Sequence, residues 1–220
     1  MNETSLNQEQ VRAGLQELEQ RLIALGNTVE SLFADSVMAL IERIPEAAPE
    51  LREEDYKAHE RWREIEKLCI DLLSSGALER EQVQFVAAAG KIATDLKRTA
   101  DESLRIAEHI RPAGRSEVRS SAQLGPIPQM AELTQSMLSD ALEAFINRDG
   151  PEASGLHLIF RQLAELGAEA VESLAQAMQK RKLPVATGLA YAGMAERLEG
   201  IGKEVLNISS QVSHLCRNNA

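Results

Sequence analysis

Two pairs of oppositely charged residues stand four positions apart in segments with helical periodicity. Lys97 precedes Asp101, and Glu199 precedes Lys203. Because four residues make about one helical turn, the two side chains of each pair point in the same direction. The spacing therefore predicts an ion pair within each helix, worth roughly a few tenths of a kcal/mol on an exposed surface.

Two histidines, His59 and His157, are further candidates for chemistry. A histidine exposed on a helix of a bundle can accept a phosphoryl group, but the lysine and glycine that usually accompany such an acceptor are missing from residues 60–63. The sequence also lacks a serine elbow, a phosphate-binding glycine loop and paired catalytic acids. We therefore expect a protein that is not an enzyme, with histidine phosphotransfer as an alternative.

The composition favours a helical, cytoplasmic protein. Of the 220 residues, 44% are apolar but only 3% are aromatic, which suits long helices better than strands. The formal net charge of −10 argues against nucleic acid as a partner. Because no apolar stretch approaches the length of a membrane span and the N-terminus does not resemble a signal peptide, we expect no membrane insertion.

Prolines and apolar periodicity divide the chain into helices. A proline inside a helix removes a hydrogen bond and clashes with the preceding turn, so the seven prolines mark breaks. Between them, apolar residues recur at steps of three and four, as at Leu15, Leu18, Leu22 and Leu25. These patterns predict an all-α protein with helices at residues 6–43, 50–73, 79–110, 129–147, 152–181 and 184–215.

The second half of the sequence repeats the first. Residues 32–43 match residues 137–148 at an offset of 105, and residues 93–106 match residues 195–208 at an offset of 102. The matches occur in the same order, which indicates a duplication. We therefore predict two tandem antiparallel three-helix bundles related by an approximate twofold axis, with a first repeat at residues 1–115, a linker at 116–128 and a second repeat at 129–220.

The predicted third helix of each repeat resembles the signature helix of the PhoU family of phosphate-uptake regulators. In the first repeat the resemblance runs from Lys91 to Asp101 and continues from Arg105 to Glu108. In the second it runs from Leu198 to Ser209, and residues 137–149 are similar to the fourth helix of the family. Taken in order, these motifs cover nearly the whole chain.

The resemblance implies a regulator without catalytic activity. Such a protein would be a cytoplasmic adaptor that represses phosphate-starvation signalling through contacts with a phosphate transporter and a sensor histidine kinase. The resemblance also implies a homodimer, and metal clusters held by an acidic pair on each third helix with help from acids on the second helices. A dimerising scaffold that has kept the fold but changed its pathway is an alternative.

The sequence departs from the acidic pairs of the family in both repeats. Lys97 and Lys203 stand where the resemblance implies acids, so that Asp101 and Glu199 are the acids that remain. A fixed ammonium group supplies the positive charge that a metal would bring. We therefore hypothesise that no metal cofactor is needed, because Lys97 pairs with Asp101 and Lys203 with Glu199.

A second hypothesis retains a metal on the third helices. His59 and His157 take the place of aspartates that the resemblance implies on the second helices, and Asp55 is kept in the first repeat. Because imidazole suits iron, zinc and nickel, a remodelled site could join His59 with Asp101, and His157 with Glu199. Both histidines could also be ordinary solvated residues.

Two further features have alternative interpretations. Trp62 could be an exposed anchor for a partner, although a lone tryptophan is more often core or half-buried. The run from Lys180 to Lys182 could contact anionic lipid or an acidic partner. The more ordinary interpretation of that run is that its cations complement the dipole at the end of the fifth helix.

Overall fold

Six long α-helices make up a computed structural model of the chain, which describes residues 8–42, 44, 47–108 and 125–218. No β-strand occurs among these residues. The predicted all-α fold class is therefore confirmed. The helices are α1 (Gln8–Glu42), α2 (Ala48–Ser74), α3 (Arg80–Glu108), α4 (Ile127–Asn147), α5 (Gly150–Gln179) and α6 (Val185–Asn218).

Three helices begin two residues earlier than predicted, because their prolines lie inside the first turn. The second residues of α2, α4 and α5 are Pro49, Pro128 and Pro151. The N–H groups of a first turn have no partner within the helix, so proline removes no hydrogen bond there. At the start of α5, the Asp149 carboxylate accepts a hydrogen bond of 2.9 Å from the backbone N–H of Glu152.

The predicted linker at residues 116–128 falls largely outside the described residues. Its last two residues, 127 and 128, belong to α4, so the linker ends earlier than the prolines suggested. At the other end of the second repeat, α6 continues three residues past the predicted end at residue 215. Leu215 is still buried there, which shows that helix packing extends to this point.

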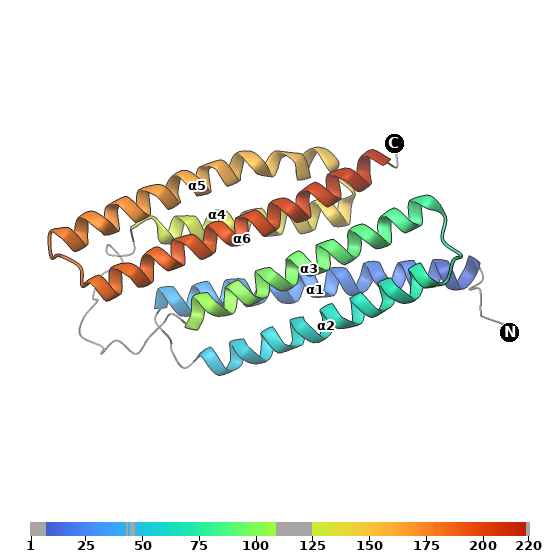
Figure 1. Cartoon of the computed structure of the whole chain (residues 1–220), viewed down its shortest axis with the longest axis horizontal. Coiled ribbons are helices and arrows are strands. Elements are labelled where there is room, and N and C mark those ends of the chain that lie inside the picture. The colour runs from blue at the N-terminus through green and yellow to red at the C-terminus, as the bar shows by residue number, and fades with distance from the viewer. Residues whose placement is uncertain (1–7, 43, 45–46, 109–124, 219–220) are drawn as a thin grey trace.

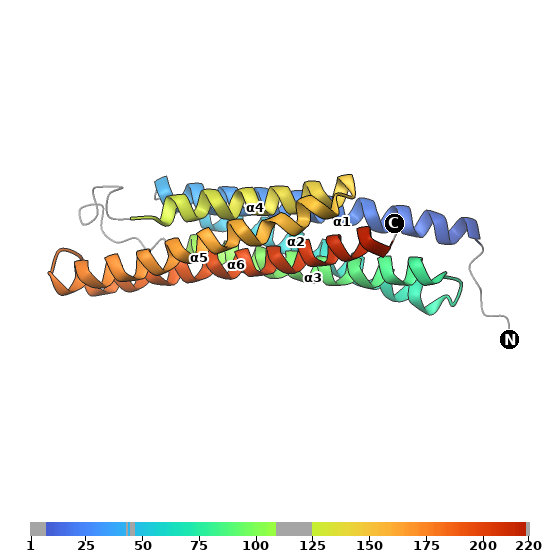
Figure 2. The ribbon, with the colours of Figure 1, turned by 90° about the horizontal axis from the view of Figure 1, so that it is seen from above.

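The helices form two three-helix bundles that lie side by side along their length (Figure 1). Helices α1, α2 and α3 pack on one another, as do α4, α5 and α6. Between the bundles, α3 packs on α6 and α1 on α4, while α2 and α5 lie at opposite outer edges (Figures 1 and 2). The equivalent helices of the two bundles, α1 and α4, α2 and α5, and α3 and α6, run antiparallel to each other (Figure 1). An approximate twofold axis perpendicular to the long direction of the molecule requires this arrangement.

Contacts between the bundles agree with the internal repeat. The side-chain amide of Gln135 on α4 donates a hydrogen bond of 3.3 Å to Glu30 Oε1 on α1, and these residues are 105 positions apart. That separation is the offset at which the first helices of the two repeats align. Equivalent residues meet where a twofold axis passes, so this contact marks the axis on the α1–α4 side.

One contiguous hydrophobic core extends through both bundles. It is built mainly from leucine, isoleucine, valine, alanine and methionine, with Phe33, Phe145 and Tyr191 as its buried aromatic residues. Trp62 is half-buried and packs against this core, as the ordinary interpretation predicted. Within the described residues, every helix is too short or too polar to span a lipid bilayer.

Candidate functional site

Three potential metal ligands meet where α2 packs on α3. Asp55 and His59 lie one turn apart on α2, and Asp101 faces them from α3. One ligand atom from each residue lies within 4.8 Å of the others, and His59 Nδ1 is 4.0 Å from Asp101 Oδ1. The structure thus brings His59 and Asp101 together, as one sequence-based hypothesis required, and adds Asp55 to them.

Lys97 contacts the other oxygen of Asp101. Its Nζ donates a hydrogen bond of 2.6 Å to Asp101 Oδ2, and both side chains are less than a quarter exposed. The ion pair predicted from the four-residue spacing is therefore present. This pair is less exposed to water than a pair on an open helix surface. Opposite charges attract each other more strongly in such an environment.

Asp55 is the least satisfied member of this cluster. Its Oδ1 atom is buried without a hydrogen-bond partner. Burial raises the pKa of Asp55, and the charge of Asp101 raises it further, while His59 and Lys97 only partly oppose these effects. Two carboxylates face one fixed ammonium here, so one negative charge is not balanced.

These donors suit a single ion rather than a metal cluster. Two carboxylates and one imidazole are a chemically acceptable set for a transition metal with an open coordination position. Asp101 is already engaged by Lys97, however, and Asp55 is the only other acid of the group. The residues would hold at most one ion, by Asp55, His59 and Asp101.

The second repeat does not form a matching group. Lys203 Nζ lies 2.8 Å from Glu199 Oε1, so the predicted ion pair is present. His157 is exposed, and its Nδ1 lies 2.5 Å from the Ser154 carbonyl oxygen. Glu199 lies beside Gly167 of α5, because a Cβ atom on Gly167 would be 3.4 Å from Glu199 Oε2. Gly167 is about 15 Å along α5 from His157, so Glu199 and His157 are well separated.

The separation of His157 from Glu199 has a simple cause. The hypothesis that His157 joins Glu199 took His157 as the counterpart of His59. It therefore assumed that α5 packs on α6 in the register that places His59 beside Asp101 in the first repeat. In the structure Gly202, next to Lys203, faces Phe160 and Leu163 instead. Asp55, His59 and Asp101 form the only group of three potential metal ligands found among the described residues.

A second polar site, which the sequence did not single out, lies where α3 packs on α6. Asp95 is only 8% exposed, and Arg98 Nη1 lies 3.6 Å from both Asp95 Oδ1 and Glu204 Oε2. Burial raises the pKa of Asp95 to about 7, with a further contribution from the charge of Glu204 and a hydrogen bond between the two side chains. A cavity of about 510 Å³ opens beside Asp95 between α2, α3 and α6.

The twofold-related position carries a different pair of charges. At the offset of 102, Arg197 corresponds to Asp95 and Glu204 corresponds to Glu102. Arg197 Nη1 donates a hydrogen bond of 2.6 Å to Glu102 Oε2, which is a conventional ion pair. One end of the α3–α6 contact therefore joins opposite charges, and the other joins two acids.

A polar residue next to the buried Leu96 could have drawn attention to Asp95 in the sequence. Periodicity does not identify the partner of Asp95 on α6, however.

Comparison with known proteins places these features in a family. The PhoU domain model matches residues 22–110 and residues 127–212. The first segment begins within α1, includes α2 and α3 and ends two residues after α3, and the second covers α4, α5 and most of α6. The chain belongs to the PhoU family. Its two halves are two PhoU domains, which accounts for the repeat in the sequence.

Relatives match along most of the chain. Proteins named phosphate-specific transport system accessory protein PhoU homolog are 27% identical over 95% of this chain in Pseudomonas putida and 25% identical over 95% in Pseudomonas aeruginosa. The matches cover 81% and 86% of those proteins. The chain therefore corresponds to most of the length of these relatives.

Solved PhoU structures share the fold. The crystal structure of PhoU from Pseudomonas aeruginosa matches 95% of this chain and 100% of its own, with a TM-score of 0.88 and 24% identity. The phosphate transport system regulatory protein PhoU from Streptococcus pneumoniae matches 94% of this chain and 96% of its own, with a TM-score of 0.84 and 24% identity. At this level of identity the likeness shows the arrangement of helices.

Proposed function

We propose that this chain regulates phosphate uptake and phosphate-starvation signalling through contacts with other proteins. The observation that carries the proposal is the match of the PhoU domain to both halves of the chain. Relatives that match 95% of the chain are named as accessory proteins of the phosphate-specific transport system. A phosphate-transporter subunit and a sensor histidine kinase are the proposed partners, and the cytoplasm is the proposed compartment.

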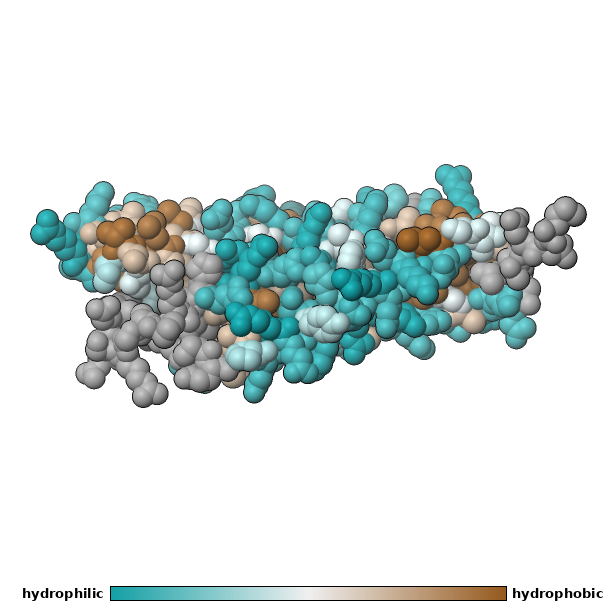
Figure 3. Space-filling view, turned by 60° about the horizontal axis from the view of Figure 1, so that its bottom comes forward, coloured by the Kyte–Doolittle hydropathy of each residue, from teal (hydrophilic) through white to brown (hydrophobic). Residues whose placement is uncertain are grey.

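The proposed mode of action is non-catalytic binding by a homodimer. On the face of the molecule seen in Figure 3, hydrophilic side chains cover the middle of the surface, and a polar face of this kind suits reversible contacts with other proteins. The charged side chains that come together at the described contacts mostly form ion pairs, such as Lys97 with Asp101 and Arg197 with Glu102. The pair of Arg197 with Glu102 joins α6 to α3, whereas the pair of Lys97 with Asp101 lies within α3. In this proposal, regulation follows from which partner is bound.

Partner capture in the native host tests this proposal. The chain is expressed from its own locus with an affinity tag, and cells are grown first with abundant phosphate and then without it. We expect a phosphate-transporter subunit or a sensor kinase among the proteins recovered, with a yield that changes between the two conditions. A strain that expresses an unrelated tagged helical bundle at the same level is the control.

Deleting the gene gives an independent measurement. If the chain represses phosphate-starvation signalling, starvation-induced genes should be expressed in the deletion strain even when phosphate is abundant. Reintroducing the wild-type gene should restore repression. Unchanged expression of those genes, together with partners that do not respond to phosphate, would show instead that the fold serves as a scaffold in another pathway.

A further inference from the structure

The hairpin that joins α5 to α6 forms one extremity of the molecule (Figure 1). It carries Lys180, Arg181 and Lys182, which are consecutive and exposed. The ion pairs found among the described residues involve other side chains. Three cations therefore stand together at one end of a chain whose net charge is −10.

Arg181 occupies a backbone position that favours glycine. Its φ angle is 54°, in the left-handed region where a Cβ atom clashes with the backbone. The equivalent turn of the first repeat, two residues after the end of α2, has Gly76 with a φ angle of 66°. The fold can therefore use glycine in this turn, and folding alone does not explain the arginine.

Aliphatic side chains are exposed next to these cations. Val185 and Leu189 lie one turn apart at the start of α6 and are 61% and 62% exposed. Figure 3 shows apolar side chains gathered at the end of the molecule formed by α5 and α6, with hydrophilic side chains at the outermost point. Cations together with exposed aliphatic groups on a convex end match the chemistry of an anionic bilayer surface, where lipid phosphates meet the acyl chains.

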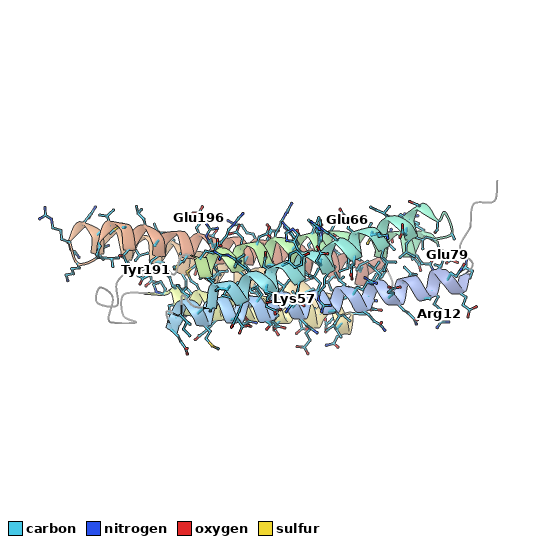
Figure 4. All side chains as sticks on the ribbon, turned by 90° about the horizontal axis from the view of Figure 1, so that it is seen from below. Arg12, Lys57, Glu66, Glu79, Tyr191 and Glu196 are labelled. Atoms are coloured by element: carbon cyan, nitrogen blue, oxygen red, sulfur yellow. The ribbon has the colours of Figure 1, made fainter. Side chains whose placement is uncertain are left out.

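The opposite end of the molecule differs in charge. The hairpin between α2 and α3 also exposes aliphatic residues, since Leu73 and Val83 are 44% and 40% exposed. Its charged residues are Glu79, Arg80 and Glu81, which sum to a negative charge. Figure 4 shows Glu79 at this end, far from the α5–α6 hairpin. The exposed aliphatic groups occur at both ends, but the cluster of cations occurs at one.

We propose that the α5–α6 hairpin docks on an anionic phospholipid surface. In this arrangement Lys180, Arg181 and Lys182 contact lipid phosphates, while Val185 and Leu189 contact the boundary between headgroups and acyl chains. The rest of the chain is acidic and is repelled by the same surface, which favours contact through this end alone. No described helix is long and apolar enough to cross a membrane. Because the proposed contact depends on charge, it is sensitive to salt.

A glycine substitution separates lipid binding from folding. Arg181→Gly removes one cation and also relieves the left-handed strain, so its thermal unfolding midpoint should equal or exceed that of the wild type. Arg80→Gln removes one cation from the opposite hairpin and is the matched control. Binding is measured by co-sedimentation with vesicles of phosphatidylcholine alone and of phosphatidylcholine mixed with phosphatidylglycerol.

The wild type should bind only the vesicles that contain phosphatidylglycerol, and less at high salt. Arg181→Gly should reduce the partition coefficient roughly fivefold, as expected for the loss of one cation, whereas Arg80→Gln should leave it unchanged. Equal binding of Arg181→Gly and Arg80→Gln, or equal binding to neutral and anionic vesicles, would overturn the proposal. Binding to polyglutamate but to neither vesicle would also overturn it and would assign the cations to an acidic protein partner.

Discussion

At the scale of single residues, Lys97 determines what its neighbouring carboxylate can bind. Its ammonium group is covalently attached and only 2.6 Å from Asp101 Oδ2, so a metal ion would have to displace it. The same ammonium partly opposes the effects that raise the pKa of Asp55. We therefore propose that Lys97 is the cation of this cluster and that no metal cofactor is required.

Elemental analysis and calorimetry test the role of Lys97. Protein purified without a tag should contain no stoichiometric iron, zinc or nickel. Lys97→Glu should create a zinc site, because it places a second acid one turn from Asp101 and beside Asp55 and His59. Lys203→Glu creates a similar acidic pair with Glu199. Among the described residues, however, α5 does not present this pair with a carboxylate and an imidazole as α2 does with Asp55 and His59, so Lys203→Glu should bind zinc more weakly. Near-stoichiometric metal in the wild type that is lost in His59→Ala would contradict the proposal.

Asp95 should make the stability of the protein depend on pH. Its pKa is about 7 in the folded state, above the ordinary value of 3.8 that applies to an unfolded chain, so the folded protein keeps a proton that the unfolded chain releases between these values. The free energy of unfolding therefore falls as pH rises through this window, and the contribution of protonated Asp95 is lost above about pH 7. Glu204, Arg98 and Lys91 are the charged groups that act on it.

Replacing Asp95 with asparagine should remove this dependence. The free energy of unfolding is measured with urea for the wild type and for Asp95→Asn, at about pH 4 and about pH 8. Between the lower and the higher pH, the variant should gain more than about 1.4 kcal/mol relative to the wild type, which is the value of one pKa unit. Glu102→Gln, at the twofold-related position, is the control and should lose the ion pair with Arg197 at both pH values. An unchanged difference between the wild type and Asp95→Asn would show that Asp95 is ionised in both states.

At the scale of helices, α6 approaches α5 closely at one glycine and leaves another free. A Cβ atom on Gly202 would lie 2.6 Å from Leu163 Cδ2 and 3.1 Å from a ring carbon of Phe160, whereas a Cβ on Gly200 would meet nothing within 4 Å. The two positions are two residues apart on the same helix. The same substitution should therefore have opposite effects at the two sites.

Alanine at each glycine measures this difference. Gly200→Ala should raise the free energy of unfolding by about 1 kcal/mol, because alanine is the better helix former. Gly202→Ala should lose that gain and destabilise the protein by roughly 1–3 kcal/mol, because Leu163 and Phe160 must move. Both values come from urea unfolding with the wild type as reference. Equal stabilisation by the two variants would mean that α5 and α6 pack less closely at Gly202.

At the scale of the whole molecule, the two PhoU domains share one hydrophobic core and the contact between α3 and α6. The sequence suggests two units separated by a linker, but continuous packing favours a single cooperative transition. Trp62, the only tryptophan, lies on α2 in the first domain and reports on that domain alone. Helical circular dichroism reports on both domains.

Coupling between the domains predicts that these two signals coincide. On heating, Trp62 fluorescence and far-UV circular dichroism should give the same midpoint. Gly200→Ala, which lies in the second domain, should shift the fluorescence midpoint of the first domain by the same amount as the circular dichroism midpoint. Separate midpoints, or a fluorescence transition that does not respond to Gly200→Ala, would show that the domains unfold independently.

The sequence by itself determined the elements of this protein. Apolar spacing and prolines define the helices, and the offsets near 105 and 102 reveal the duplication, because these signals are local or repeated along the chain. The ion pairs of Lys97 with Asp101 and of Glu199 with Lys203 were predictable for the same reason. In each pair both partners belong to one helix, whose geometry is fixed at 3.6 residues per turn.

Only the tertiary structure decided the contacts between helices. Asp55 and His59 meet Asp101, and Asp95 meets Glu204, because of the register in which one helix packs on another. His157 lies away from Glu199 for the same reason. A shift of one residue moves a side chain by about 1.5 Å and turns it by about 100° around the helix, and periodicity does not fix that shift. Packing of the buried faces does.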